Sequence, residues 1–127
     1  MAPAARRLGL AVEPREALRE WDSGIGPTPD WPAHFRRCWD DPAYATGGGE
    51  PHDALARRVA AALAAVRAET PDGAVVVVGS HGGWISRALQ GLGCRVDADF
   101  WFAMPMPAVY AVAYDGEQVT KVSGPGL

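Results

Sequence analysis

The chain has 127 residues, of which 48% are hydrophobic, and carries a formal net charge of -3. These values predict one domain spanning residues 1–127, and the single lysine, Lys121, leaves no basic patch of the kind that nucleic-acid-binding proteins carry. No apolar run approaches the roughly 20 residues that a membrane span needs. Cys38 and Cys94 show neither metal-ligand spacing nor a disulfide framework, which favours a reducing, cytoplasmic location.

The N-terminal third of the chain is predicted to be largely irregular. Residues 3–10, PAARRLGL, are typical of a helix end closed by a glycine, and a short extended stretch follows them. Residues 23–51 are rich in glycine, proline and aspartate, and we expect one short helix there, over residues 33–39. A loop of this length inside a compact domain is usually functional or disordered, and its aromatic side chains favour an ordered lid.

The remainder of the chain alternates helical and strand patterns. Apolar residues recur every three or four positions over residues 53–67 and predict an amphipathic helix. Residues 74–78, AVVVV, show no alternation, which is typical of a strand buried on both faces in a parallel sheet. A second helix is predicted from Gly82 to about residue 92, and residues 108–123 predict a hairpin that turns at Asp115 and Gly116. The sequence therefore predicts an α/β fold: a three-layer sandwich with a mostly parallel sheet and a C-terminal β-hairpin.

His81 lies where the predicted valine strand ends and the next helix begins. Free N–H groups and the helix dipole attract anions at such a corner, and a histidine there can bind phosphate, move a proton or attack phosphorus. Residues 78–82, VGSHG, differ from the serine hydrolase motif G-x-S-x-G in their first residue, and no triad histidine follows Ser80. A nucleotide-binding P-loop is excluded because no Gly-Lys-Ser/Thr follows. Histidine-centred phosphoryl chemistry remains.

Three segments carry a family resemblance, in the family's order. They are residues 17–24, ALREWDSG; residues 47–59, GGGEPHDALARRV; and residues 75–93, VVVVGSHGGWISRALQGLG. With them the chain resembles the histidine phosphatase superfamily, which has the phosphoglycerate-mutase-like fold. The resemblance covers nearly the whole chain.

The resemblance implies roles for a few residues. His81 and Gly82 would bind the phosphate, with His81 stabilising the transferring phosphoryl group, and Glu20 would protonate the leaving oxygen. The substrate would be a small phosphorylated compound, with no metal and no cofactor required. We expect Glu50 to anchor the start of a helix and Arg87 to form a surface ion pair. We expect the other two histidines, at positions 34 and 52, to be solvated.

The family's nucleophile is a histidine in an Arg-His-Gly motif, and this chain contains no such motif. Only 19 residues precede Glu20, so the first strand of the family, which carries the nucleophile, has no counterpart, and we expect the fold to be N-terminally incomplete. Without a nucleophile no phosphohistidine can form. The expected function is a phosphomonoester hydrolase of this family that is inactive as this chain alone. The alternative is a non-catalytic phosphate-binding or protein-interaction domain derived from the same fold.

The missing strand has a second consequence. In the family it is central to the sheet, so its loss exposes the edge and the apolar faces of residues 75–78. An apolar edge of that kind invites pairing with another chain. We therefore expect the isolated chain to form a homo-oligomer through this sheet edge, to exchange a segment, or to be poorly stable.

Overall fold

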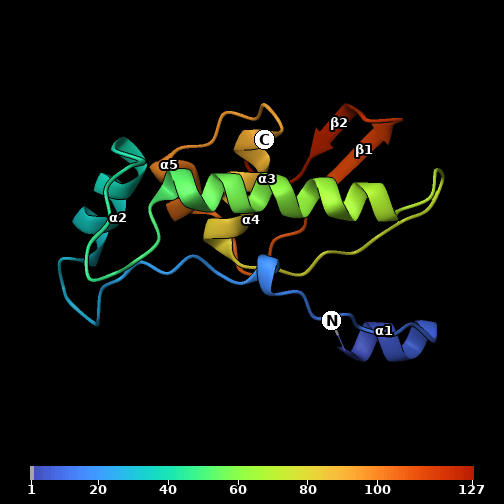
Figure 1. The fold of residues 1–127 in the computed structure, drawn as a ribbon, viewed down its shortest axis with the longest axis horizontal. Helices are drawn as coiled ribbons and strands as arrows, with labels where there is room; N and C mark the ends of the chain where they lie inside the picture. The colour runs from blue at the N-terminus through green and yellow to red at the C-terminus, as the bar shows by residue number, and fades with distance from the viewer. Residues whose placement is uncertain (1) are drawn as a thin grey trace.

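The computed structural model describes residues 2–127 and contains helices along most of its length, with a small sheet at its C-terminal end (Figure 1). In chain order the elements are α1 (Ala2–Leu8), the short 3-10 helix η1 (Glu16–Leu18), α2 (Trp31–Asp40), α3 (His52–Glu69), α4 (Gly82–Gly91), α5 (Ala98–Ala103), β1 (Ala111–Asp115) and β2 (Gln118–Ser123).

The helices predicted from apolar periodicity are confirmed. The pattern over residues 53–67 lies in α3, and the helix expected from Gly82 is α4. The short helix expected over residues 33–39 is α2, and Gly9 follows α1 with a φ of 66°, in the left-handed region that glycine adopts most easily. Helix α5 was not predicted, because its sequence ADFWFA is too short and too aromatic to show a helical period.

The core lies between α3 and α4, which run past one another at the centre of the molecule (Figure 1). Leu55 and Val59 of α3 meet Trp84 and Ala88 of α4, and Trp21 completes this cluster from the N-terminal loop. A second, smaller cluster lies on the other side of α4 and consists of Trp39, Leu89, Val96 and Ala98. Burial on both sides makes α4 the central element of the fold.

The C-terminal hairpin is confirmed, but the mostly parallel sheet is wrong. Strands β1 and β2 pair antiparallel, with Asp115 opposite Gln118 at the turn, and within residues 2–127 they make up the whole sheet. Residues 74–80, here called the valine arm, form no strand. Valine favours β-structure, but a strand exists only as part of a hydrogen-bonded ladder, and no described strand lies beside the arm. The observed architecture is a mixed helical fold with a small antiparallel sheet.

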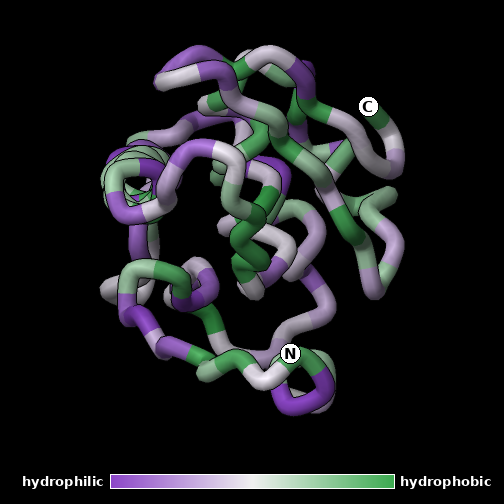
Figure 2. The backbone as a smooth tube through the Cα atoms, turned by 90° about the vertical axis from the view of Figure 1, so that its right-hand side faces the viewer, coloured by the Kyte–Doolittle hydropathy of each residue, from purple (hydrophilic) through white to green (hydrophobic). Residues whose placement is uncertain are grey.

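Helix α1 stands apart from the body of the molecule (Figure 1). Leu8, Leu10 and Val12, at its end and just after it, are all exposed. In Figure 2, where α3 is seen nearly end-on, a segment rich in hydrophobic residues runs through the middle of the molecule. No helix among residues 2–127 is long and apolar enough to cross a membrane.

Candidate active site

His81 stands at the N-terminal end of α4, as its sequence position predicts. It is the residue that precedes the helix, with extended backbone (φ -126°, ψ 172°), and its side chain is exposed. Gly82 and Gly83 follow it and are buried. A Cβ on Gly83 would lie 2.8 Å from Glu20 Oε1 and 3.2 Å from Trp21 Cβ, so only glycine lets the chain of Glu20 approach the helix this closely.

The carboxylate of Glu20 lies against the same helix end. Its Oε1 accepts hydrogen bonds from the backbone N–H groups of Trp21, at 2.8 Å, and Trp84, at 3.1 Å. Its Oε2 accepts from the N–H of Gly83, at 3.3 Å. Negative charge is favourable at a helix N-terminus, where the first N–H groups have no partner within the helix. The structure thus brings Glu20 to the corner that His81 begins, although the two residues are 61 positions apart.

We call residues 17–21 together with the first turn of α4 the Glu20 corner. Within residues 2–127, Gly82 is the residue of that turn whose N–H has neither a backbone nor a side-chain acceptor. Glu20 occupies the N–H groups of the next two residues. The N–H of Gly82 and the exposed side chain of His81 are therefore groups of this helix end that Glu20 does not occupy.

Arg58 of α3 holds the backbone of the corner in place. Its guanidinium donates to the carbonyl oxygens of Ala17, at 2.9 Å, and Arg19, at 3.0 Å. It also binds both carboxylate oxygens of Glu50, at 2.9 and 2.6 Å, and the side chains of this pair are only 17% and 13% exposed. The hydrogen bonds to Glu50 raise the pKa of Arg58. The planar fork of arginine suits this two-sided task, which a lysine could not perform.

Further side chains bind the same stretch from α4 and from the valine arm. Trp84 Nε1 donates to the carbonyl of Ala17 at 2.9 Å, and Ser80 Oγ donates to that of Leu18 at 2.8 Å. Trp21 Nε1 donates to the carbonyl of Glu50 at 2.7 Å. Glu50 therefore anchors the start of α3, as the sequence suggests. The role of Arg58 was missed. In the sequence Arg58 is simply an arginine eight residues after Glu50 on a predicted helix, and this position does not identify the groups that it binds.

Two expectations about nearby residues are wrong, and for the same reason. His52 is 1% exposed and lies edge-on between Trp21 and Trp39, so it is not solvated. Arg87 is 6% exposed, stacks on Trp39 and donates to His52 Nδ1 and Gln90, and within residues 2–127 it forms no ion pair. The aromatic rings that cover both side chains come from segments distant in sequence, and a local pattern cannot reveal such cover.

Burial controls the protonation of this pair. It lowers the pKa of His52 to about 3, with the positive charge of Arg87 acting in the same direction. It also lowers the pKa of Arg87 to about 10. His52 is therefore neutral at pH 7 and can accept the hydrogen bond from Arg87. Within residues 2–127 neither side chain forms a hydrogen bond with His81, and both pack in the core.

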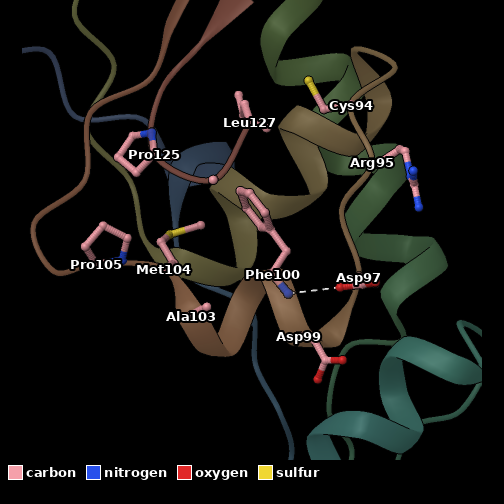
Figure 3. Close-up of a pocket in the computed structure, with 11 residues that line it drawn as sticks. Cys94, Arg95, Asp97, Asp99, Phe100, Ala103, Met104, Pro105, Pro125 and Leu127 are labelled. Atoms are coloured by element: carbon pink, nitrogen blue, oxygen red, sulfur yellow. Dashed lines mark hydrogen bonds between the residues drawn. The ribbon is translucent and has the colours of Figure 1, made fainter.

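A separate hollow of about 720 Å³ lies at the C-terminal end of the chain (Figure 3). It is bounded by residues 94–105 and by Pro125, Gly126 and Leu127, and neither His81 nor Glu20 lines it. Among residues 2–127, no group of three histidine, cysteine or acidic side chains is placed to hold a metal ion. The candidate site therefore rests on His81, Gly82 and Glu20.

Comparison with known proteins gives one match. The family model described as "Histidine phosphatase superfamily (branch 1)" matches residues 1–123. No curated protein and no solved structure matches the chain. The matched residues include all three segments on which the resemblance rests. The chain belongs to the histidine phosphatase superfamily.

Proposed function

We propose that the Glu20 corner binds the phosphate of a small phosphomonoester. His81 contacts the phosphoryl oxygens, the N–H of Gly82 donates to one of them, and Glu20 stands beside the leaving oxygen as its proton donor. The observation that carries the proposal is the convergence of Glu20 and His81 on the N-terminal end of α4 in a member of this family. Phosphate is the anion that such a helix end accommodates best.

We further propose that this chain alone does not turn substrate over. The family's two-step reaction needs a histidine nucleophile in an Arg-His-Gly motif, which the 127 residues lack. The remaining groups at the corner bind charge and donate a proton, and neither action breaks the phosphorus–oxygen bond without an attacking group. The chain then acts as a phosphate-binding domain, which is the second candidate function.

Titration with inorganic phosphate, followed through the backbone amide signals of α4, tests the binding step. We expect the Gly82 and Gly83 signals to shift with saturation, and the shifts to weaken at least tenfold in His81→Ala. His34→Ala is the matched control, because His34 lies in α2 and its hydrogen-bond partners among residues 2–127 are Ser23, Cys38 and Tyr44. Shifts that persist unchanged in His81→Ala would place phosphate elsewhere.

Hydrolysis of para-nitrophenyl phosphate tests the second step. We expect no release of nitrophenol above the uncatalysed rate. Clear hydrolysis that disappears in His81→Ala would show that this chain has a nucleophile of its own. Phosphate binding without hydrolysis supports the binding domain.

A further inference from the structure

Trp101 of α5 lies beside the N-terminal end of α4. A Cβ on Gly82 would lie 3.2 Å from Trp101 Nε1 and 3.4 Å from Met106 Cε, so both side chains border the helix end. Helix α5 packs against α4, and its start is fixed by Asp97, whose side chain accepts from the N–H of Phe100 at 2.9 Å (Figure 3). The edge of the indole that carries the N–H is therefore the part of Trp101 nearest to Gly82.

The indole N–H of Trp101 and the backbone N–H of Gly82 both lack an acceptor within residues 2–127. By contrast, the indole N–H groups of Trp21 and Trp84 donate to backbone carbonyls, at 2.7 and 2.9 Å. A Cβ lies about 2.5 Å from the backbone nitrogen of its own residue, so the two donor nitrogens are within about 6 Å of each other. Two hydrogen bonds of ordinary length span that separation when both end on one phosphoryl group.

The ring of Trp101 is held in place by other aromatic rings. Its centroid lies 5.0 Å from that of Phe35 in α2 and 4.9 Å from that of Phe102. Phe35 in turn meets Trp21 edge-on at 4.8 Å, and Trp21 follows Glu20 in the chain. Aromatic pairs at such distances are favourable beyond the area that they bury. Trp101 is therefore positioned before a ligand arrives, which lowers the entropy cost of binding.

The segment around Trp101 carries no charge. Residues 100–109, FWFAMPMPAV, contain no ionisable side chain, and the indole N–H is their one side-chain hydrogen-bond donor. Met106 is 77% exposed, although its methyl group lies at the helix end. Arg36, which lies over an aromatic ring of α5, is paired with Asp99 at 2.7 Å. A leaving group that contacts this segment therefore gains from apolar surface and meets no unpaired charge there.

We propose that Trp101 is a further substrate-binding residue of the Glu20 corner and that the substrate is a phosphomonoester of an aromatic alcohol. The indole N–H donates to a phosphoryl oxygen beside the N–H of Gly82, and the aromatic leaving group packs against Met106 and the edge of the Trp101 ring. An aromatic ring gains from ring–edge and sulfur–aromatic contacts that an aliphatic group lacks. The proposal rests on the proposed phosphate binding and narrows its substrate class.

Trp101→Phe tests the indole donor, because it keeps a ring and removes the N–H. The Kd of phenyl phosphate is measured from the amide signals of Gly82 and Gly83, and in the parent the Trp101 indole signal should shift with the same saturation. We expect the Kd to rise at least tenfold, since a hydrogen bond to a charged group is lost. Trp31→Phe is the matched control: it makes the same change in a ring of the same cluster that does not approach Gly82, and it should leave the Kd unchanged.

A comparison of ligands tests the substrate class. Phenyl phosphate and glycerol 1-phosphate carry the same phosphoryl group on an aromatic and on a polar leaving group, and at about pH 8 both are fully ionised. We expect the parent to bind phenyl phosphate at least fivefold more tightly. Met106→Ala should reduce this preference about threefold and leave the Kd of inorganic phosphate and the melting temperature unchanged, because the side chain is exposed. Val109→Ala truncates another exposed apolar side chain of the segment and should leave the preference intact.

Three outcomes would overturn the proposal, and they separate it from phosphate binding itself. Gly82 shifts with inorganic phosphate, together with a static Trp101 indole signal and an unchanged Kd in Trp101→Phe, would keep the phosphate site and reject Trp101. Equal affinity for phenyl phosphate and glycerol 1-phosphate would reject the aromatic leaving group. No shift of any α4 amide with any of the three ligands would reject phosphate binding at the corner and this proposal with it.

Discussion

The valine arm leads into the α4 turn of the Glu20 corner, yet the arm and the corner differ in how their polar groups are satisfied. Most polar groups of the corner have partners: Arg58, Ser80 and Trp84 donate to the backbone carbonyls of residues 17–19, and Glu20 accepts from the N–H groups of Gly83 and Trp84. The arm is open: Val75, Val76 and Val77 are exposed, and within residues 2–127 no backbone–backbone hydrogen bond involves residues 75–80. The comparison shows that the chain satisfies most polar groups of the corner with its own side chains, whereas it leaves the backbone of residues 75–80 without backbone partners among residues 2–127.

The largest expected effect on stability is at the Glu20 corner. Arg58→Ala removes the fork that holds Glu50 and two carbonyl oxygens, and it leaves the largely buried carboxylate of Glu50 with only the longer contact to Arg19, at 3.6 Å, among the described ion pairs. We expect the free energy of unfolding to fall by about 4 kcal/mol. Arg57→Ala is the matched control on the same helix, because Arg57 is 72% exposed and its one ion pair within residues 2–127 is with Asp53, and it should cost less than about 0.5 kcal/mol. Urea unfolding measures both, and equal losses would contradict the role of Arg58.

A substitution inside the corner comes next. Gly83→Ala places a methyl group 2.8 Å from Glu20 Oε1, which forces the carboxylate off the helix end. We expect a loss of about 3 kcal/mol in the free energy of unfolding. Gly91→Ala in the same helix has open space around the new Cβ and should be neutral or gain up to about 1 kcal/mol. Thermal unfolding of the two variants checks the contrast, which fails if they behave alike.

The pH dependence follows from His52. Its pKa is about 3 in the folded chain and about 6.5 when unfolded, so below pH 6.5 the unfolded state binds the extra proton and gains stability relative to the fold. The contribution is fully present above pH 6.5 and is lost as the pH falls. Between pH 7 and pH 5 we expect a decrease of about 2 kcal/mol in the free energy of unfolding. His52→Gln keeps an acceptor for Arg87 but does not titrate, so its urea midpoint should vary less with pH over this range.

The smallest effect on stability is expected in the valine arm. Val77→Ala should change the free energy of unfolding by less than about 0.5 kcal/mol, because the side chain is 76% exposed. Val59→Ala makes the same chemical change where the side chain is 2% exposed, and it should cost about 2 kcal/mol. A cost at Val77 near that at Val59, measured by urea unfolding, would mean that the arm is covered in solution.

The sequence predicts the parts of this molecule that local chemistry determines. The apolar period of α3, the Gly82–Gly83 start of α4 and the Asp115–Gly116 turn each identify their element without knowledge of the rest. The meeting of Glu20 with α4 was expected only through the family resemblance. The burial of His52 and Arg87 depends on rings of distant segments, so sequence patterns could not show it.

The valine arm shows the opposite case, in which the sequence predicts a strand that the fold does not form. Four consecutive valines state a strong preference for β-structure, but the preference is realised only where a neighbouring edge exists. Composition predicts what a segment can form, and the fold decides whether a partner is present. The wrong expectation of a parallel sheet therefore identifies the place where this chain is unpaired.

The hydrogen bond from Ser80 to the carbonyl of Leu18 connects the valine arm to the Glu20 corner. It joins the last residue of the arm to the backbone two residues before Glu20, so the position of the arm and the position of Glu20 are coupled. The arm and the corner are therefore joined two residues from the carboxylate that accepts from the Gly83 N–H.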